Sequence, residues 1–488
     1  MMRFIRNTIT AVLILLSLSC GHTNASSDLA DRHSLFKKNV SKPIKFDLDK
    51  IKSRGTLRAI VFEGPTSYFL YKGQAMGFEY ELLKHFATHL NVDLKIIVAK
   101  NFDELGELLN SGAGDLIAHG FTVTLDRQKS FMFSDYLYLT KQVLVQRKPK
   151  NWRAMKLHEI DKELKHDPIH LIGDTVTIRD HSSYKMRLEN VMNEIGGLIH
   201  MNIVDSSIST DELIHMVHKG DIKYTIADNT IANVFSYHFK NLHVSTPISF
   251  SQRASWVLRR NTPELKSALD AWITQMKQRT DYYVIYNRYF KNRSSILRHV
   301  ESDYYFNRTG EISPYDDLIK KYAENLPWDW LLLASQVYQE SRFDPEAKSW
   351  ARAHGLMQIM PSTAEELGIT NTANPEESLR GGTSYLLDLW NEWQSIPDVK
   401  ERIKFTLASY NAGLYHIKDA VRLTTQLGGN PKLWDDHVEQ AVLKLTLKKY
   451  YTRPEIKYGY VQGTEPVNYV KDILKRHRLY QSFFEETI

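Results

Sequence analysis

The feature that most constrains the fold is a change of hydrophobic periodicity beyond the middle of the 488-residue chain. Before it, short apolar runs such as "GTLRAIVFEG" and "VDLKIIVA" alternate with amphipathic segments such as "GFEYELLKHFATHL", a pattern typical of a parallel α/β sheet. After it, the apolar residues recur every three or four positions, as in helices. Because one core rarely extends over so long a chain, we expect an α/β part followed by a separate all-α part.

The α/β part itself divides in two. Near residue 145 the chain leaves its first unit and forms new strands in "IHLIGDTVTI", "HMNIVDS" and "YTIADN". The segment "NLHVSTPISF" and a helix over 263–286 then return to the first unit. We therefore predict a two-lobed module over residues 45–292. The remaining expected boundaries are a second lobe at about 145–245, a polar linker at 293–310 and the helical domain at 311–488.

The N-terminus predicts export. In "MMRFIRNTITAVLILLSLSC", Arg3 and Arg6 precede a short apolar run and small residues, which is typical of a secretory signal over 1–20 rather than a membrane span. The only cysteine of the chain is Cys20, so no disulfide framework is expected. We expect Cys20 to be lipidated, which predicts a periplasmic protein held at the outer membrane by a polar tether, 21–44. The alternative is peripheral membrane contact, with the signal cleaved after Ala25.

Composition excludes several function classes. A net charge of +6 over this length gives no strong case for nucleic acid. The 19 histidines include no HExxH arrangement, so neither a metal site nor a cofactor is predicted.

The helical part contains one conspicuous carboxylate. The mostly apolar stretch "WLLLASQVYQES" ends with Gln339, Glu340 and Ser341. A glutamate pressed against apolar surface has a raised pKa, which a general acid working near neutral pH requires. Taken alone, however, a glutamate at a helix end is usually an ordinary surface residue.

Three further segments follow Glu340 within about seventy residues: "GLMQIMPSTA", "GGTSYLLDL" and "ASYNAG". Together the four resemble the soluble lytic transglycosylase domain, which has a goose-lysozyme-like fold, over roughly 310–480. The resemblance implies that Glu340 is the single catalytic acid/base and that Ser341 orients the N-acetyl group of the substrate. It also implies a set of groove residues, with the last facing Glu340: Gln358, Tyr410, Asn411 and Tyr469. The stretch "SWARAHGLMQ" departs from the small turn usual in this family, which puts one subsite in doubt.

The reaction implied by this resemblance is non-hydrolytic cleavage of peptidoglycan glycan strands. Ordinary glycosidases need two carboxylates. A transglycosylase can use one, because the acetamido oxygen of the substrate stabilises the developing cation and the C6 hydroxyl attacks C1. The product is a 1,6-anhydro-MurNAc end. Two alternatives remain open: hydrolysis as in lysozyme, or an amino-acid or peptide receptor whose helical domain only binds the wall. The intact motif residues count against the second.

The front module resembles the extracellular solute-binding proteins of amino-acid transporters in "GTLRAIV", "GFEYELLKHFA", "GDLIAHGFTVTLDRQKSFMFSDYLY" and "YTIADNTIANV". The resemblance implies that Arg127 clamps the ligand carboxylate, with Thr122 beside it, and that Asp228 pairs with the ammonium group. Tyr68 would pack on the ligand. Without the resemblance these would be surface, cap and core residues. Because His119 replaces a usually small polar residue, a ligand other than a free amino acid remains open.

A solute-binding module followed by a lytic transglycosylase domain is similar to one family of membrane-bound murein transglycosylases, over nearly the whole mature chain. This similarity implies that the front module senses a muropeptide or an amino acid. Closure of the two lobes about a hinge would then control access to the catalytic groove.

Overall fold

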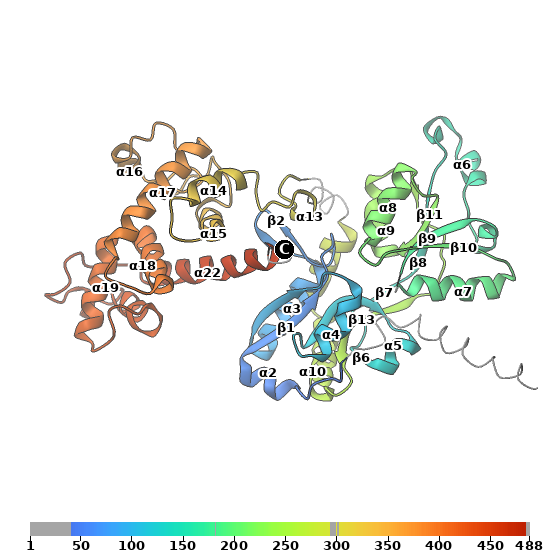
Figure 1. Ribbon diagram of the computed structural model, residues 1–488, viewed down its shortest axis with the longest axis horizontal. Helices are drawn as coiled ribbons and strands as arrows, with labels where there is room; N and C mark the ends of the chain where they lie inside the picture. The colour runs from blue at the N-terminus through green and yellow to red at the C-terminus, as the bar shows by residue number, and fades with distance from the viewer. Residues whose placement is uncertain (1–40, 181, 293–298, 300–301, 485–488) are drawn as a thin grey trace, which may run out of the picture. The chain divides into compact units, whose positions relative to one another are not determined.

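The computed structural model describes residues 41–180, 182–292, 299 and 302–484 (Figure 1). The predicted signal peptide, Cys20 and nearly all of the predicted tether lie outside these residues. The chain divides into two compact units. The first comprises the chain up to Phe69 and Ala75–Glu301, and the second comprises Leu70–Gln74 and Ser302–Ile488. The expected multidomain fold, a two-lobed α/β module followed by a helical domain, is confirmed.

The first lobe contains a six-stranded sheet of order β4-β1-β5-β13-β6, with β7 also paired to β13. Strand β1 runs parallel to β4 and β5, whereas β13 runs antiparallel to β5. The strands are β1 (Thr56–Val61), β4 (Asp93–Val98), β5 (Leu116–Thr122), β6 (Phe131–Phe133), β7 (Tyr138–Thr140) and β13 (Gln252–Arg259). The helices are α2 (Leu48–Arg54), α3 (Phe78–Leu90), η1 (Phe102–Glu104), α4 (Leu105–Asn110), α5 (Leu125–Ser130), α10 (Pro263–Met276), α11 (Thr280–Tyr286) and η4 (Asn287–Lys291).

One predicted helix of this lobe is in fact two. The segment 263–286 was expected to be continuous, but Arg279 has an extended backbone between α10 and α11. Thr280 and Asp281 then start the second helix, a position that favours residues with short polar side chains.

The second lobe contains a five-stranded sheet of order β10-β9-β11-β8-β12. The chain enters it directly after β7 and returns into β13, so two crossings join the lobes. The strands are β8 (Gln142–Arg147), β9 (Thr175–Arg179), β10 (His200–Val204), β11 (Tyr224–Asp228) and β12 (Leu242–His243). The helices are η2 (Trp152–Ala154), α6 (Leu157–Glu163), η3 (Pro168–Leu171), α7 (Ser183–Ile195), α8 (Thr210–Lys219) and α9 (Asn229–His238).

The strand predicted for "IHLIGDTVTI" begins only at Thr175. Its first half forms η3, because Asp167 accepts a hydrogen bond from the Ile169 N–H and Pro168 occupies the first helical position. Apolar periodicity alone does not distinguish a short helix from a strand in such a run.

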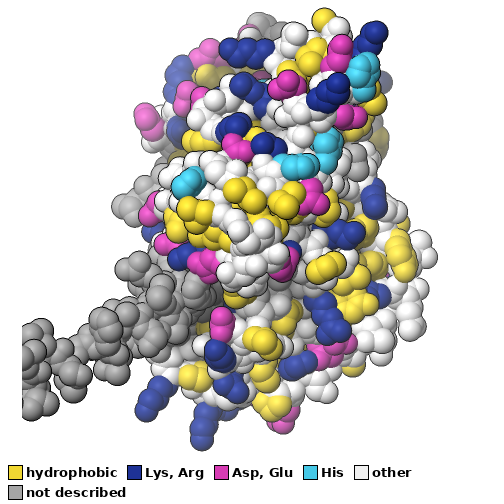
Figure 2. All heavy atoms as spheres, turned by 90° about the vertical axis from the view of Figure 1, so that its right-hand side faces the viewer, with side chains coloured by type: hydrophobic (Ala, Val, Ile, Leu, Met, Phe, Trp, Pro, Cys, Tyr) yellow, Lys and Arg dark blue, Asp and Glu magenta, His cyan; other side chains and the backbone are white. Residues whose placement is uncertain are grey.

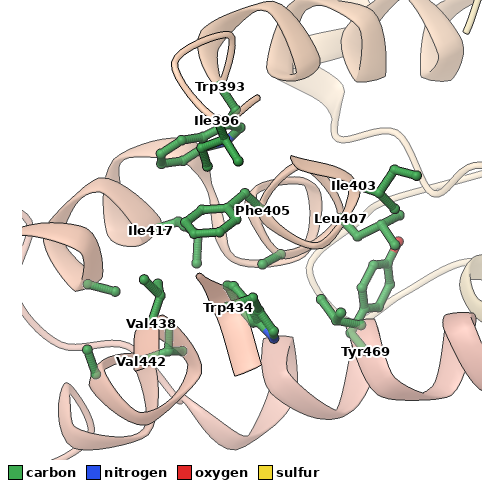
Figure 3. Close-up of a cluster of buried hydrophobic side chains, with 14 of the residues drawn as sticks. Trp393, Ile396, Ile403, Phe405, Leu407, Ile417, Trp434, Val438, Val442 and Tyr469 are labelled. Atoms are coloured by element: carbon green, nitrogen blue, oxygen red, sulfur yellow. The ribbon is translucent and has the colours of Figure 1, made fainter. Parts of the chain in front are cut away.

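The second unit is helical around one large apolar core (Figure 3). Its helices are α13 (Phe306–Thr309), α14 (Asp316–Ala323), α15 (Trp330–Ser341), α16 (Pro361–Glu366), α17 (Pro375–Glu392), α18 (Val399–Ala412), α19 (Leu414–Gln426), η5 (Trp434–Val438), α20 (Glu439–Lys444), α21 (Lys448–Tyr451) and α22 (Thr464–Phe484). The core includes Phe405 and Trp434, both almost completely buried. Within the described residues, no helix combines the length and apolarity needed to cross a bilayer.

Candidate functional site

Helix α15 places Glu340 in its last turn. The helix starts where Asp329 accepts a hydrogen bond from the Leu332 N–H, and its residues from Leu331 to Tyr338 are buried. It stops because Arg342 and Phe343 both have left-handed backbones, with φ of 54° and 63°. The helix C-terminus carries a partial negative charge, which disfavours an ionised carboxylate nearby.

Glu340 is a neutral acid at pH 7 in this setting. Its pKa is raised to about 8, chiefly by burial; the hydrogen bond from Tyr469 opposes this shift, and the nearby Glu465 adds to it. The Tyr469 hydroxyl donates to Oε1 of Glu340. The proton of the neutral carboxyl group therefore resides on Oε2, the oxygen that does not accept from Tyr469.

Tyr469 is held rigidly. It projects from α22, its side chain is 5% exposed, and its ring belongs to the apolar core (Figure 3). Burial and the neighbouring Glu340 raise the pKa of Tyr469 well above its usual value. The hydroxyl consequently keeps its proton and remains a hydrogen-bond donor, so the predicted tyrosine does face Glu340.

Tyr410 and Asn411 lie at the end of α18, just before the left-handed Gly413. The Tyr410 hydroxyl donates to the Met357 carbonyl oxygen at 2.8 Å. Burial raises the pKa of Tyr410 well above its usual value, and Glu340 raises it further, which indicates that the two groups are close. Asn411 follows Tyr410 in the sequence and is half-buried.

Gln358 and Ser341 are both anchored to the backbone. The Gln358 side-chain nitrogen donates to the carbonyl oxygens of Ala347 at 2.9 Å and Gly355 at 3.0 Å. The buried Ser341 hydroxyl donates to the Val337 carbonyl oxygen at 3.1 Å. Gln358 therefore shapes the loop as well as lying in it, and its own backbone is left-handed, with φ of 48°.

Glycines explain why the "GLMQ" and "GGTS" segments occur together. A Cβ atom on Gly382 would lie 2.7 Å from the Met357 Cβ, so only glycine lets α17 approach the loop this closely. Gly355 has a φ of 84° and lies directly against the Thr372 carbonyl group. The two segments thus form one packed support for Gln358 and Tyr410.

An unexpected part of the second unit is the hairpin tip Leu70–Gln74, which comprises the end of β2 (Phe69–Tyr71), the turn and the start of β3 (Gln74–Met76). The Tyr480 hydroxyl donates to the Gly73 carbonyl oxygen at 3.0 Å. A Cβ atom on Gly73 would lie 2.7 Å from the Tyr338 ring and 2.8 Å from the Phe343 ring. Both rings flank the Glu340 turn in sequence. No pattern in the sequence indicated this contact.

In the first unit, the predicted carboxylate clamp Arg127 lies near other charged residues. Arg127 is 9% exposed, and one of its terminal nitrogens donates to the Thr122 carbonyl oxygen at 2.8 Å. The Thr122 hydroxyl lies 3.5 Å from the Gln252 side-chain oxygen. The pKa of Arg127 is lowered to about 9, chiefly by burial and also by the second-lobe Arg179, while Asp228 opposes the shift. The three charged groups therefore interact across the lobes.

Asp228 ends β11, as predicted, and burial raises its pKa to about 7, while Arg127 and Arg179 lower it. One of its carboxylate oxygens is buried without a hydrogen-bond partner among the described residues. Arg179 was not predicted as a site residue. Its guanidinium carbon lies 3.8 Å above the ring of Phe102, which belongs to the first lobe. An arginine at a strand end carries no sequence signal for this role.

His119 and Tyr68 differ in how well they can meet a ligand. His119 lies among Phe62, Phe102 and Phe121, and its pKa is lowered to about 3, chiefly by burial and also by Arg179 and Arg127. It is therefore neutral. Tyr68 is completely buried, and its ring lies 5.5 Å from that of Tyr80. Its contact with a ligand remains a prediction.

Two known protein families match separate parts of the chain. The family described as bacterial extracellular solute-binding proteins, family 3, matches residues 57–292, and the transglycosylase SLT domain matches residues 317–432. Tyr469 lies beyond the second match. The chain also resembles holo ArgBP from T. maritima, with 25% identity and a TM-score of 0.39 over 49% of this chain and 97% of that one.

Full-length relatives share both parts. A membrane-bound lytic murein transglycosylase F from Desulfosudis oleivorans is 32% identical over 426 residues, which cover 87% of this chain and 90% of that protein. One from Aliivibrio fischeri is 31% identical over 451 residues, covering 91% of this chain and 86% of that protein. The shared order of modules, over nearly the full length of each protein, shows that the chain belongs to the membrane-bound lytic murein transglycosylase F family.

Proposed function

We propose that this lytic murein transglycosylase cleaves the β-1,4 bond between MurNAc and GlcNAc without water and leaves 1,6-anhydro-MurNAc ends. The observation that carries the proposal is the desolvated Glu340, with a pKa of about 8 and a tyrosine on one of its oxygens. A carboxyl group that is protonated at neutral pH can act as a general acid there.

In the first step, Oε2 of Glu340 gives its proton to the glycosidic oxygen, and the bond from that oxygen to C1 of MurNAc breaks. The acetamido oxygen of the substrate stabilises the positive charge on C1. In the second step, the Glu340 carboxylate takes the proton of the C6 hydroxyl, and O6 bonds to C1. Atoms balance without water, and Glu340 is protonated again.

The surrounding residues position rather than transfer protons. Tyr469 keeps the Glu340 carboxyl group oriented through both steps. Ser341, Gln358, Tyr410 and Asn411 contact the sugars, and the loop that carries Gln358 is rigid because its side chain and Tyr410 both bond backbone carbonyl groups. Such preorganisation favours a reactive substrate geometry.

The front module regulates this site by binding an amino acid or a stem-peptide fragment. Arg127 takes the carboxylate and Asp228 the ammonium group, and Arg179 completes the charge pattern from the second lobe. The hairpin tip Leu70–Gln74, which lies in the second unit although the chain on both sides of it belongs to the module, packs against Tyr338 and Phe343 within the second unit and links ligand binding to the site. The protein acts in the periplasm, with Cys20 as a lipid anchor in the outer membrane.

The test is mass spectrometry of soluble products after the purified full chain meets isolated sacculi. Products lighter by one water than hydrolysed muropeptides support the proposal. Hydrated products would instead assign lysozyme-type hydrolysis to the same site. The absence of any product would make ligand binding the main function.

A further inference from the structure

A basic pocket of about 520 Å³ opens on the second lobe, where β8, η2 and the ends of α8 and α9 meet. Five lysine and arginine side chains line it: Arg147, Lys148, Lys150, Arg153 and Lys240. None of its described lining residues is acidic. Its volume is within the roughly 300–1,000 Å³ of small-molecule sites.

These cations are not neutralised by neighbours. Among the described residues, none of the five forms an ion pair. Three other cations of this lobe are paired: Lys165 and Lys223 both contact Asp174, and Arg187 contacts Glu194. Figure 2 shows Lys, Arg and His side chains on the upper part of the face in view, interspersed with Asp and Glu side chains.

Hydrogen bonds hold the floor of the pocket in place. Arg147 donates to the Lys219 carbonyl oxygen at 3.0 Å, and the Lys148 ammonium group donates to the Lys240 carbonyl oxygen at 2.8 Å. The carbonyl groups at helix C-termini offset only part of this charge. Burial lowers the pKa of Lys148 and the nearby Lys240 lowers it further, as expected where like charges lack a counterion.

Aromatic rings support the cations. The Lys148 ammonium nitrogen lies 4.6 Å from the centre of the Trp152 ring, and the Arg153 guanidinium carbon lies 5.2 Å from it. Lys240 lies 4.0 Å from the ring of Tyr237, which is 44% exposed. Tyr and Trp beside cations are typical of surfaces that meet lipid headgroups.

We propose that the basic pocket binds a phosphate-bearing ligand. A single carboxylate would neutralise one of the five cations, whereas a phosphate group concentrates up to about two charges and three acceptor oxygens in one place. Two sources share this chemistry, a soluble phosphate compound and the headgroup of an anionic lipid. The lining of the pocket includes neither Glu340 nor the charged residues Arg127, Arg179 and Asp228.

The test is calorimetric titration of the full chain at low salt with three soluble probes. These are inorganic pyrophosphate, glycerophosphoglycerol, and dihexanoyl phosphatidylglycerol below its micelle concentration. The pocket variant combines Lys150→Gln with Lys240→Gln, both at exposed positions. The matched control combines Lys52→Gln with Lys95→Gln, which removes the same charge from exposed positions of the first lobe. Melting temperatures check that both variants fold.

We expect pyrophosphate affinity to fall at least tenfold in the pocket variant and to stay unchanged in the control, with transglycosylase activity unaffected in both. Tighter binding of the short-chain lipid than of glycerophosphoglycerol identifies the lipid headgroup as the source, and equal binding identifies soluble phosphate. Equal losses in both variants, or no pyrophosphate binding at low salt, would overturn the proposal. So would a pocket variant that loses only sacculus binding, because the ligand would then be wall polymer.

Discussion

The two candidate sites bury charged groups in opposite ways. In the second unit one carboxyl group, Glu340, is stripped of water and stays protonated near neutral pH. In the first unit Arg127, Arg179 and Asp228 interact, and their opposite charges partly compensate for the free-energy cost of burial. A proton donor needs a pKa near the working pH, whereas recognition of a zwitterion needs charges that persist. The difference matches the two proposed roles, proton donation by Glu340 and ligand binding by Arg127 and Asp228.

The largest effect is expected from Glu340→Gln, which removes the only proposed proton donor. Activity on sacculi should fall by about 10³-fold or more, because general acid–base catalysis contributes roughly 10²–10⁴-fold and here one group serves both steps. Mass spectrometry of released anhydro products measures it. The exposed Glu346→Gln serves as the control. Normal product release by the Glu340→Gln variant would show that another residue is the proton donor, and the proposed difference between the two sites would then be wrong.

Arg127→Ala tests the proposed ligand-binding site of the first unit. Removing one partner of a buried charge pair costs roughly 2–5 kcal/mol of binding, so affinity for a stem tetrapeptide should fall about 100-fold. Isothermal titration calorimetry measures this loss, with the exposed Arg279→Ala as the control. Unchanged affinity would show that ligand binding does not use Arg127. Product release in the absence of tetrapeptide should remain as in the parent protein.

Tyr469→Phe tests whether the tyrosine tunes Glu340. The hydrogen bond lowers the pKa of Glu340, so its loss should move the alkaline limit of activity to higher pH. We expect kcat to fall about tenfold, because one charge-assisted hydrogen bond is worth roughly 1.5–3 kcal/mol. A pH–rate profile measures both effects, with the exposed Tyr283→Phe as the control. A lower rate without a shifted limit would assign Tyr469 a purely structural role.

The two sites should respond to pH in opposite directions. Glu340 must be protonated to act first as an acid, so activity should decline as the pH rises through about 8. Asp228 must be ionised to hold an ammonium group, so ligand affinity should increase several-fold as the pH rises through about 7. Parallel profiles of activity and calorimetric affinity from pH 6 to 9 compare them. Two profiles with the same slope would contradict the contrast in charge.

The smallest effect is expected from Gly73→Ala in the hairpin tip. Its φ of 68° and its close approach to Tyr338 and Phe343 leave no room for a methyl group. Overpacking of this kind typically costs about 1–3 kcal/mol, which a thermal melt detects. Because both rings flank Glu340, tetrapeptide should also alter the activity of this variant less than that of the parent. Gly310→Ala, with no atoms within 4 Å of the added methyl group, controls for backbone strain at positive φ.

Local patterns were sufficient for much of this protein. The alternation of strands and helices, followed by helical spacing alone, predicted the fold class correctly, because periodicity records which face of an element is buried. An apolar helix ending in Glu340 pointed to a desolvated acid for the same reason. The errors, the split helix near Arg279 and the short η3, fall where caps and backbone conformation override apolar spacing.

The tertiary structure decided what depends on residues far apart in the sequence. The Tyr469 hydroxyl reaches Glu340 across 129 positions. Arg179 stacks on a ring of the other lobe, and the hairpin tip Leu70–Gln74 joins a unit that otherwise begins at Ser302. None of these contacts produces a local pattern, since each is selected by packing between separate segments. The sequence thus predicted Glu340 as the acid, and the three-dimensional contacts set its pKa.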